Sequence, residues 1–308
     1  MTSNRHNLTR YIPEKVKRYV RQRDGFGCIV CGNAIYQYDH LGTEFKDSER
    51  HDPNKIVLLC GGCHDQKTRG FLSTDTILMR AKSPVCKQNN FSWGVLDIGN
   101  THPEVVLGGL TAINVKSLLT IDGEDVFSIK PPSRKHGPFL VNASLFDRGG
   151  RQTLKIVDNE LQISTSSWDV EVSGGRFKFR SNLREFILVI RIEPHHRLII
   201  ERLDMIYKNS SIQCTEGGHT VIKSENGTTL TARGGKISGF DIAINIEGDC
   251  MGLGVMSRTH NPGALPCGRL GNSLNLAPRG EGQIKQGRNS MCLCGSGRKF
   301  KYCHGQQP

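Results

Sequence analysis

Between residues 85 and 256, short runs of the chain alternate apolar and polar residues. Examples are TLKIV, RFKFR and DIAINIE, and turn-forming stretches such as DRGG, VSGG and SENGT separate them. Alternation with a period of two predicts strands, and short strands repeated about every ten residues predict an all-β domain. Few helical patterns interrupt them, which favours an antiparallel sandwich or barrel. A β-solenoid is the second choice, because the glycine-rich stretch 228–248 fits successive coils, although no fixed-period repeat is visible.

The N-terminal part of the chain shows helical spacing instead. The stretch 13–25 begins with proline, ends in glycine and places two valines four residues apart, which predicts a helix. A second helix is expected to begin near Cys63 or His64. A third is expected over 74–82, with Ser73 as its N-cap.

Changes in composition divide the chain into four expected parts, which makes it an α+β multidomain protein. A proline at position 84 marks the end of the helical part, and Gly, Pro, Asn, Ser and Arg dominate from residue 257. The predicted parts are an N-terminal unit at 1–84, a β-rich recognition or regulatory domain at 85–256, a flexible basic linker at 257–289 and a small C-terminal module at 290–308.

Basic residues concentrate at the two ends of the chain. Residues 1–82 hold 14 Lys and Arg against 9 Asp and Glu, and residues 257–308 hold 8 against 1, whereas the middle is neutral. Basic ends on a neutral centre predict contact with a polyanion such as DNA, with RNA not excluded.

Several classes of protein are disfavoured by the same sequence. No apolar run approaches the roughly 20 residues that cross a bilayer, and the first 20 residues lack the apolar stretch of a signal peptide. A cytoplasmic protein with no membrane partner is therefore expected. Eleven cysteines, an odd number, fit a complete disulfide framework poorly and favour metal binding or burial.

Two Cys-x-x-Cys pairs stand near the N-terminus. Cys28 and Cys31 form the first pair, and Cys60 and Cys63 form the second, 28 residues further on. Two such pairs can supply four thiolates to one tetrahedral zinc ion. The sequence therefore predicts a structural zinc site.

A second group of residues lies inside and beside that unit: Asp39, His40, Asn54 and His64. Hydrolysis of a phosphodiester needs a divalent ion at the scissile phosphate and a base that activates water. Asp39 and His64 can supply oxygen and nitrogen ligands to the ion. His40 points to the other side of a strand from Asp39, because successive side chains alternate, and can face the attacking water.

These residues carry a family resemblance. The segments RDGFGCIVCG, YDH, IVLLCGGCH and QKT, within about residues 12–73, resemble the zinc-knuckle class of HNH endonucleases. The resemblance implies a ββα-metal, treble-clef-like unit braced by the four-cysteine zinc. It also implies that Asp39 and His64 hold one catalytic divalent ion, Mg²⁺ or Mn²⁺, and that His40 is the general base.

One position departs from the family pattern. Lys55 stands where the family usually has its middle asparagine, five residues before the third cysteine, and Asn54 precedes it. Either Asn54 or His51 is then the candidate for orienting the site. A further alternative is that the unit has lost catalysis and is a zinc adaptor that binds nucleic acid and protein.

A Cys/His cluster ends the chain, with Cys292, Cys294, Cys303 and His304 as three sulfurs and one nitrogen for a second zinc ion. The segment at about 290–305 resembles the SEC-C motif, a small zinc module found on the protein-translocation ATPase and on many unrelated proteins. The resemblance implies zinc binding and, often, a protein partner. So short a segment cannot bury a core, so the metal is its main source of folding energy.

Taken together, the motifs predict a metal-dependent endonuclease that nicks or cleaves DNA. Bacterial proteins with similar units often serve phage defence or mobile elements, which is an association only. The sequence leaves the oligomeric state open. The cations predicted to contact nucleic acid are Lys17, Arg18, Arg21, Arg23, Lys67 and Arg69.

Overall fold

The computed structural model describes residues 3–42 and 45–256 of the chain. These residues divide into two compact units. Unit 1 combines the described residues up to Val95 with 152–155 and 160–187, and unit 2 holds the other described residues. Strands β9 (Gln152–Val157) and β13 (Phe186–Glu193) each contain a point of division.

Unit 1 extends past the boundary predicted at Pro84, because the next strand returns to the N-terminal residues. In β3 (Phe91–Val95), the backbone N–H of Trp93 donates to the carbonyl of Gly32 at 2.9 Å, and the carbonyl of Trp93 accepts from Ala34 at 2.6 Å. Strand β3 also pairs antiparallel with β10 (Glu160–Ser164), a partner far along the chain. Unit 1 therefore includes segments that the sequence analysis assigned to the β domain.

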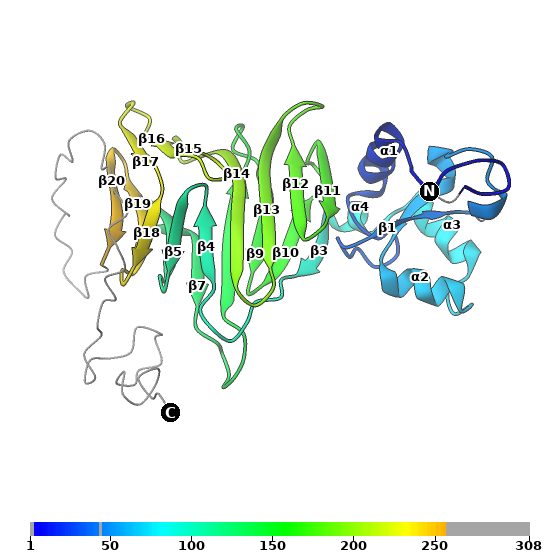
Figure 1. Ribbon diagram of the computed structural model, residues 1–308, viewed down its shortest axis with the longest axis horizontal. Coiled ribbons are helices and arrows are strands. Elements are labelled where there is room, and N and C mark those ends of the chain that lie inside the picture. Colours follow the sequence, from blue (N-terminus) through cyan, green and yellow to red (C-terminus); the bar gives the residue numbers. More distant parts are fainter. Residues whose placement is uncertain (1–2, 43–44, 257–308) are drawn as a thin grey trace. The chain divides into compact units, whose positions relative to one another are not determined.

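The remaining elements of unit 1 are short, and Figure 1 labels most of them. They are α1 (Glu14–Asp24), β1 (Gln37–His40), η1 (Phe45–Asp47), η2 (Pro53–Lys55), β2 (Ile56–Leu59), α2 (Gly61–Thr68), α3 (Thr74–Lys82), α4 (Val85–Asn89), β11 (Asp169–Ser173) and β12 (Arg176–Arg180).

The predicted helices form where local signals place them. Helix α1 begins after Pro13 and ends at Gly25, whose left-handed φ of 82° lets its N–H return to the carbonyl of Arg21. Helix α2 begins two residues before the predicted start at Cys63. Helix α3 covers the predicted residues, and the side chain of Ser73 caps it by accepting from the N–H of Thr76.

Strand β2 is the centre of unit 1 and is buried on both faces. Its sequence, IVLL, is therefore uniformly apolar and does not alternate. Ile56 and Leu58 pack with Val20 of α1. Val57 and Leu59, on the other face, pack with Cys28, Cys63 and Ile77 of α3. Strand β1 pairs antiparallel with β2, and in Figure 1 it lies between α1 and α2.

Unit 2 is built from strands. They are β4 (Glu104–Leu107), β5 (Leu110–Ile113), β6 (Ser117–Ile121), β7 (Glu124–Lys130), β8 (Leu140–Phe146), β14 (Arg197–Tyr207), β15 (Ser210–Thr215), β16 (Thr220–Lys223), β17 (Thr229–Ala232), β18 (Gly235–Ser238), β19 (Ile242–Glu247) and β20 (Cys250–Val255).

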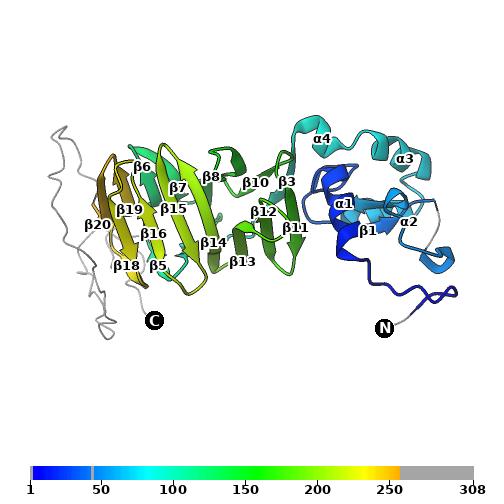
Figure 2. The same ribbon diagram turned by 90° about the horizontal axis from the view of Figure 1, so that it is seen from above.

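The strands of unit 2 make two sheets, visible in Figure 2. One has the order β20, β19, β6, β7, β8, and in the other β14 neighbours β13, β15 and β4. Pairing is mostly antiparallel, with parallel pairs at β14–β4, β18–β5 and β19–β6. The predicted β-rich centre is thus confirmed. The first sheet has a linear order, the second branches at β14, and neither closes into a barrel.

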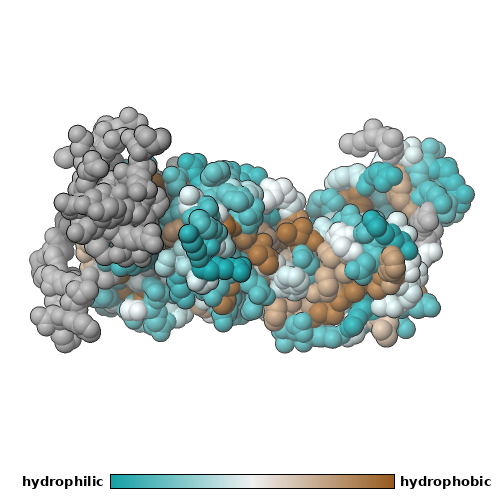
Figure 3. Space-filling view, turned by 90° about the horizontal axis from the view of Figure 1, so that it is seen from below, coloured by the Kyte–Doolittle hydropathy of each residue, from teal (hydrophilic) through white to brown (hydrophobic). Residues whose placement is uncertain are grey.

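The strands also show the predicted alternation. In β8, every second side chain is buried, which places one face of the strand in the core. Figure 3 shows hydrophobic residues mixed with hydrophilic ones on one face of the molecule. Among the residues that the structure describes, none of the helices combines the length and the apolar character needed to cross a membrane.

Candidate metal centre and nuclease site

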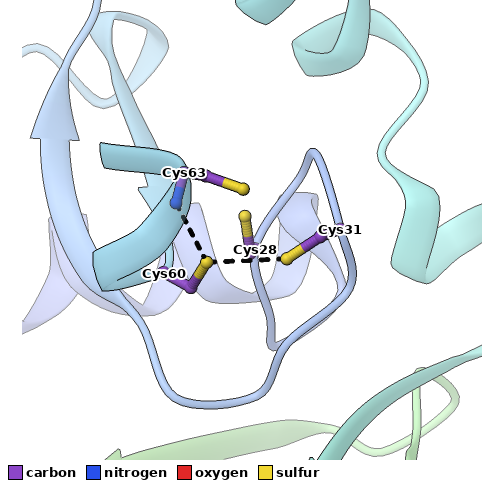
Figure 4. Close-up of side chains that lie close together, drawn as sticks. All are labelled: Cys28, Cys31, Cys60 and Cys63. Carbon is purple, nitrogen blue, oxygen red and sulfur yellow. Dashed lines mark hydrogen bonds between the residues drawn. The ribbon is translucent and has the colours of Figure 1, made fainter. Parts of the chain in front are cut away.

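Four cysteines gather at the start of α2. Cys28 and Cys31 come from the loop after α1, Cys60 is the N-cap of α2, and Cys63 lies in its first turn. Their sulfurs all lie within 4.8 Å of one another, and Figure 4 shows the four side chains converging. A tetrahedral zinc with Zn–S bonds of about 2.3 Å separates its sulfurs by about 3.8 Å, so the cluster suits zinc.

The four cysteines differ in how readily they form the thiolate that binds metal. A hydrogen bond from Cys31 lowers the pKa of the Cys28 thiol to about 5, although burial opposes the shift. Burial raises the pKa of Cys63 to about 12. The sulfur of Cys60 lies 3.5 Å from that of Cys31 and accepts from the N–H of Cys63 at 3.3 Å. Zinc requires thiolates, so its binding releases the protons that remain.

The first cysteine pair is held by a tryptophan. The indole Nε1 of Trp93 donates to the carbonyl of Cys31 at 2.7 Å. Gly32 adopts a φ of 83° beneath this ring, and a Cβ there would lie 3.1 Å from it. Glycine is therefore needed both for the left-handed turn and for the close approach.

Asp39 projects from β1 toward α2. Its Oδ1 lies 3.4 Å from Nε2 of His64, and the two side chains are 12% and 39% exposed. Its Oδ2 accepts from Nζ of Lys67, which also donates to the carbonyl of His40 at 3.0 Å. The structure thus brings together the two candidate metal ligands, and adds an ammonium group that the sequence analysis had assigned to nucleic acid.

His40 lies on the other side of β1. Its ring centroid is 5.7 Å from that of Phe45 and 5.6 Å from that of His51. Its Nε2 is buried without a hydrogen-bond partner among the described residues. Burial, aided by the nearby His51, lowers the pKa of His40, which favours the neutral ring.

The two candidates for the orienting role occupy different places. His51 lies beside His40, and its Nε2 contacts the carbonyl of Thr9 at 2.9 Å, while its Nδ1 is buried without a described partner. Asn54 is exposed in η2, where its side-chain oxygen lies 3.5 Å from the hydroxyl of Tyr19. Of these two candidates, only His51 makes a described contact with His40.

The cations predicted to contact nucleic acid all have acidic partners within unit 1. The pairs are Lys17 with Glu14, Arg18 and Arg21 with Asp169, Arg23 with Asp24, Lys67 with Asp39, and Arg69 with Asp65. Arg21 is only 1% exposed, so the prediction that it contacts a phosphate is wrong. A helical pattern shows only that Arg21 is charged, and not that an aspartate from a distant strand covers it.

One further cation lies against an aromatic neighbour of His40. The guanidinium of Arg10 lies 4.9 Å from the ring of Phe45, which also neighbours His40. Arg5 and Arg50 are 67% and 84% exposed, and they pair with Asp47 and Asp52 at 3.2 and 3.9 Å. The sequence analysis passed over them because single arginines in an N-terminal stretch and a loop carry no spacing signal.

Comparison with known proteins identifies a short motif at the end of the chain. A family model described as the SEC-C motif matches residues 288–306. The four predicted ligands of the second zinc lie there, outside the described residues. The SecA protein translocase subunits of Pelodictyon phaeoclathratiforme and Chlorobium limicola are each 71% identical over 24 residues. That match covers 8% of this chain and 2% of either subunit.

A second comparison concerns nuclease chemistry. A protein of Lactococcus phage SK1 named "Probable HNH endonuclease" is 37% identical over 62 residues. The match covers 17% of this chain and 65% of the phage protein. No solved structure matches. This partial similarity agrees with the HNH resemblance.

Proposed function

We propose that this chain is an HNH-type endonuclease that hydrolyses phosphodiester bonds of DNA with one divalent ion. The arrangement of β1 carries the proposal. Asp39 faces His64 on α2, while His40 faces the opposite side of the strand. Hydrolysis needs an ion on the leaving-group side and a base on the side of the attacking water. The partial similarity to the phage protein supports the same activity.

Asp39 and His64 would hold the catalytic Mg²⁺ or Mn²⁺. A carboxylate oxygen and an imidazole nitrogen 3.4 Å apart form a donor set that suits such an ion. When bound, the ion would polarise the scissile phosphate and stabilise charge on the leaving oxygen. Lys67 already neutralises Asp39, so its ammonium group competes with the ion for the same carboxylate.

His40 would take the proton from the attacking water. Its unpartnered Nε2 can accept a proton, and its ring is flanked by Phe45 and His51. We assign the orienting role to His51, because its ring lies beside that of His40. Asn54, which contacts Tyr19 instead, is left without a role in the reaction.

The two zinc sites would have different tasks. The four-cysteine zinc would fix α2 to the loop after α1, and so would hold His64 opposite Asp39. The SEC-C segment would bind a second zinc and would either recruit a protein partner or add affinity for nucleic acid. The high positive charge of residues 257–308 supports the latter.

The direct test uses supercoiled plasmid and purified full-length protein, with and without Mg²⁺ or Mn²⁺. Nicking should require the ion and should be lost in His40→Ala, with DNA binding and zinc content retained. His6→Ala is the matched control, because His6 is an exposed histidine of the same unit and should cut like wild type. If His40→Ala nicks as fast as wild type, His40 is not the base.

The alternative is a non-catalytic zinc adaptor for nucleic acid and protein. Two observations favour it. The ammonium group of Lys67 forms an ion pair with Asp39, and Lys55 stands at the usual asparagine position. An adaptor would bind DNA with a full complement of zinc and would fail to nick it under any divalent ion. Nicking that depends on His40 would exclude this function.

A further inference from the structure

A buried ion pair joins α1 to a strand far along the chain. Nε of Arg21 donates to Oδ1 of Asp169 on β11 at 2.8 Å, and Nη2 donates to Oδ2 at 2.7 Å. The two side chains are 1% and 0% exposed. A paired, two-point contact of this kind fixes orientation as well as distance. Both residues belong to unit 1, although 148 positions separate them.

The same guanidinium also holds the strand that carries the candidate site. Nη1 of Arg21 donates to the hydroxyl of Tyr38 at 2.9 Å. Tyr38 is the residue of β1 immediately before Asp39 and His40. Burial raises the pKa of Tyr38, so its hydroxyl stays protonated and neutral.

A second tyrosine, Tyr36, packs against Tyr38 and also contacts β11. Tyr36 precedes Tyr38 by two residues, and their rings meet edge to face at 5.8 Å. The hydroxyl of Tyr36 donates to the carbonyl of Val170 on β11 at a longer 3.4 Å. β11 therefore reaches this part of the chain twice, once through Arg21 and once directly.

We propose that Asp169, Arg21 and Tyr38 form a positioning network that sets the place of Asp39 and His40. This inference rests on the proposed nuclease function. Asp39 and His40 point to opposite sides of β1, so a small shift of the strand displaces metal ligand and base together. A misplacement of about 1 Å can cost about a hundredfold in rate. Segment 160–187 would then belong to the nuclease and not to a separate recognition domain.

The variant Tyr38→Phe tests whether the Tyr38 hydroxyl positions Asp39 and His40 or only stabilises the fold. It removes one hydroxyl and leaves both the ring and the Arg21–Asp169 pair in place. Tyr36→Phe is the matched control, since it deletes a hydroxyl from the neighbouring tyrosine, which donates to the carbonyl of Val170 at 3.4 Å and does not contact Arg21 through a described hydrogen bond. A purely structural role would make the two variants alike.

The experiment compares both variants with wild type in the full-length protein. The measurements are kcat and KM for plasmid nicking, Mn²⁺ affinity by calorimetry with Asp39→Ala as the baseline, and zinc content. Tyr38→Phe should lower kcat about tenfold at unchanged KM, and should weaken Mn²⁺ binding several-fold. Tyr36→Phe should stay within about twofold of wild type in both readouts, and both variants should keep their zinc.

Two results separate the inference from the function on which it rests. If Tyr38→Phe matches Tyr36→Phe in kcat and in Mn²⁺ affinity, the network is structural only and the inference is wrong. If wild type fails to nick, the proposed function fails, and Mn²⁺ affinity alone then decides whether Tyr38 positions Asp39.

Discussion

Replacing Asp169 with alanine tests the energetics of the buried pair. The change removes the carboxylate that faces Arg21 and leaves a guanidinium that is 1% exposed. Burial by itself lowers the pKa of Arg21, but the hydrogen bond with Asp169 and nearby charges raise it above its ordinary value. Arginine does not lose its proton in proteins, so its side chain stays charged even when it is buried. The variant therefore keeps a buried charge whose remaining carboxylate neighbour, Glu14, is half exposed and 3.9 Å away, which costs about 3–5 kcal/mol of unfolding free energy.

Urea unfolding measures this loss within unit 1. Both tryptophans of the chain, Trp93 and Trp168, lie in unit 1, so fluorescence reports that unit. With a urea dependence of about 2 kcal/mol/M, a loss of about 4 kcal/mol lowers the midpoint by about 2 M. The protein should be loaded with zinc throughout, because metal binding also contributes to folding.

Two controls make the reasoning refutable. The double variant Arg21→Met with Asp169→Leu removes both charges and should recover most of the loss, because apolar residues can replace a buried pair. Asp65→Ala breaks the exposed pair with Arg69 and should change the midpoint little. A shift below about 0.5 M for Asp169→Ala, or a double variant no better than the single one, would refute the argument.

Two further predictions concern charge. Lys67→Met should raise Mn²⁺ affinity about fivefold, because Asp39 loses a competing cation worth about 1 kcal/mol, and calorimetry against wild type checks this. Deleting residues 257–308 removes a net charge of +7 and should flatten the salt dependence of DNA binding while nicking at low salt survives. An unchanged salt slope would instead assign the C-terminal module to a protein partner.

Local signals in the sequence predicted the frame of unit 1. The cap at Ser73 and the proline and glycine around α1 place two helices, because these residues act through the backbone of their own segment. The four cysteines converge as their spacing predicts, since each pair needs only one tight turn. The alternating runs also predicted the strands of unit 2, although not the order in which they pair.

Partners far apart in sequence could not be predicted in this way. Arg21 looks like a solvent-facing cation on a helix, and nothing near it in the chain indicates Asp169. Lys67 follows His64 by three residues and was expected to bind phosphate, but it forms an ion pair with Asp39. His51 reached His40 through a loop whose course has no periodic pattern. In each case, tertiary contacts, and not local propensity, decide what the charge does.

The extent of unit 1 changes which residues belong to the proposed nuclease. A fragment ending at Val95 would contain all four zinc-binding cysteines and Asp39, His40 and His64, yet it would lack β10 and β11. In that fragment, Arg21 would have no Asp169, and β3 would have no β10. Joining residues so distant in sequence costs loop entropy, which the buried pair and the strand pairing must offset. The similarity to the phage protein spans 62 residues, fewer than unit 1 contains, so part of the structure that supports Asp39, His40 and His64 lies outside any such match.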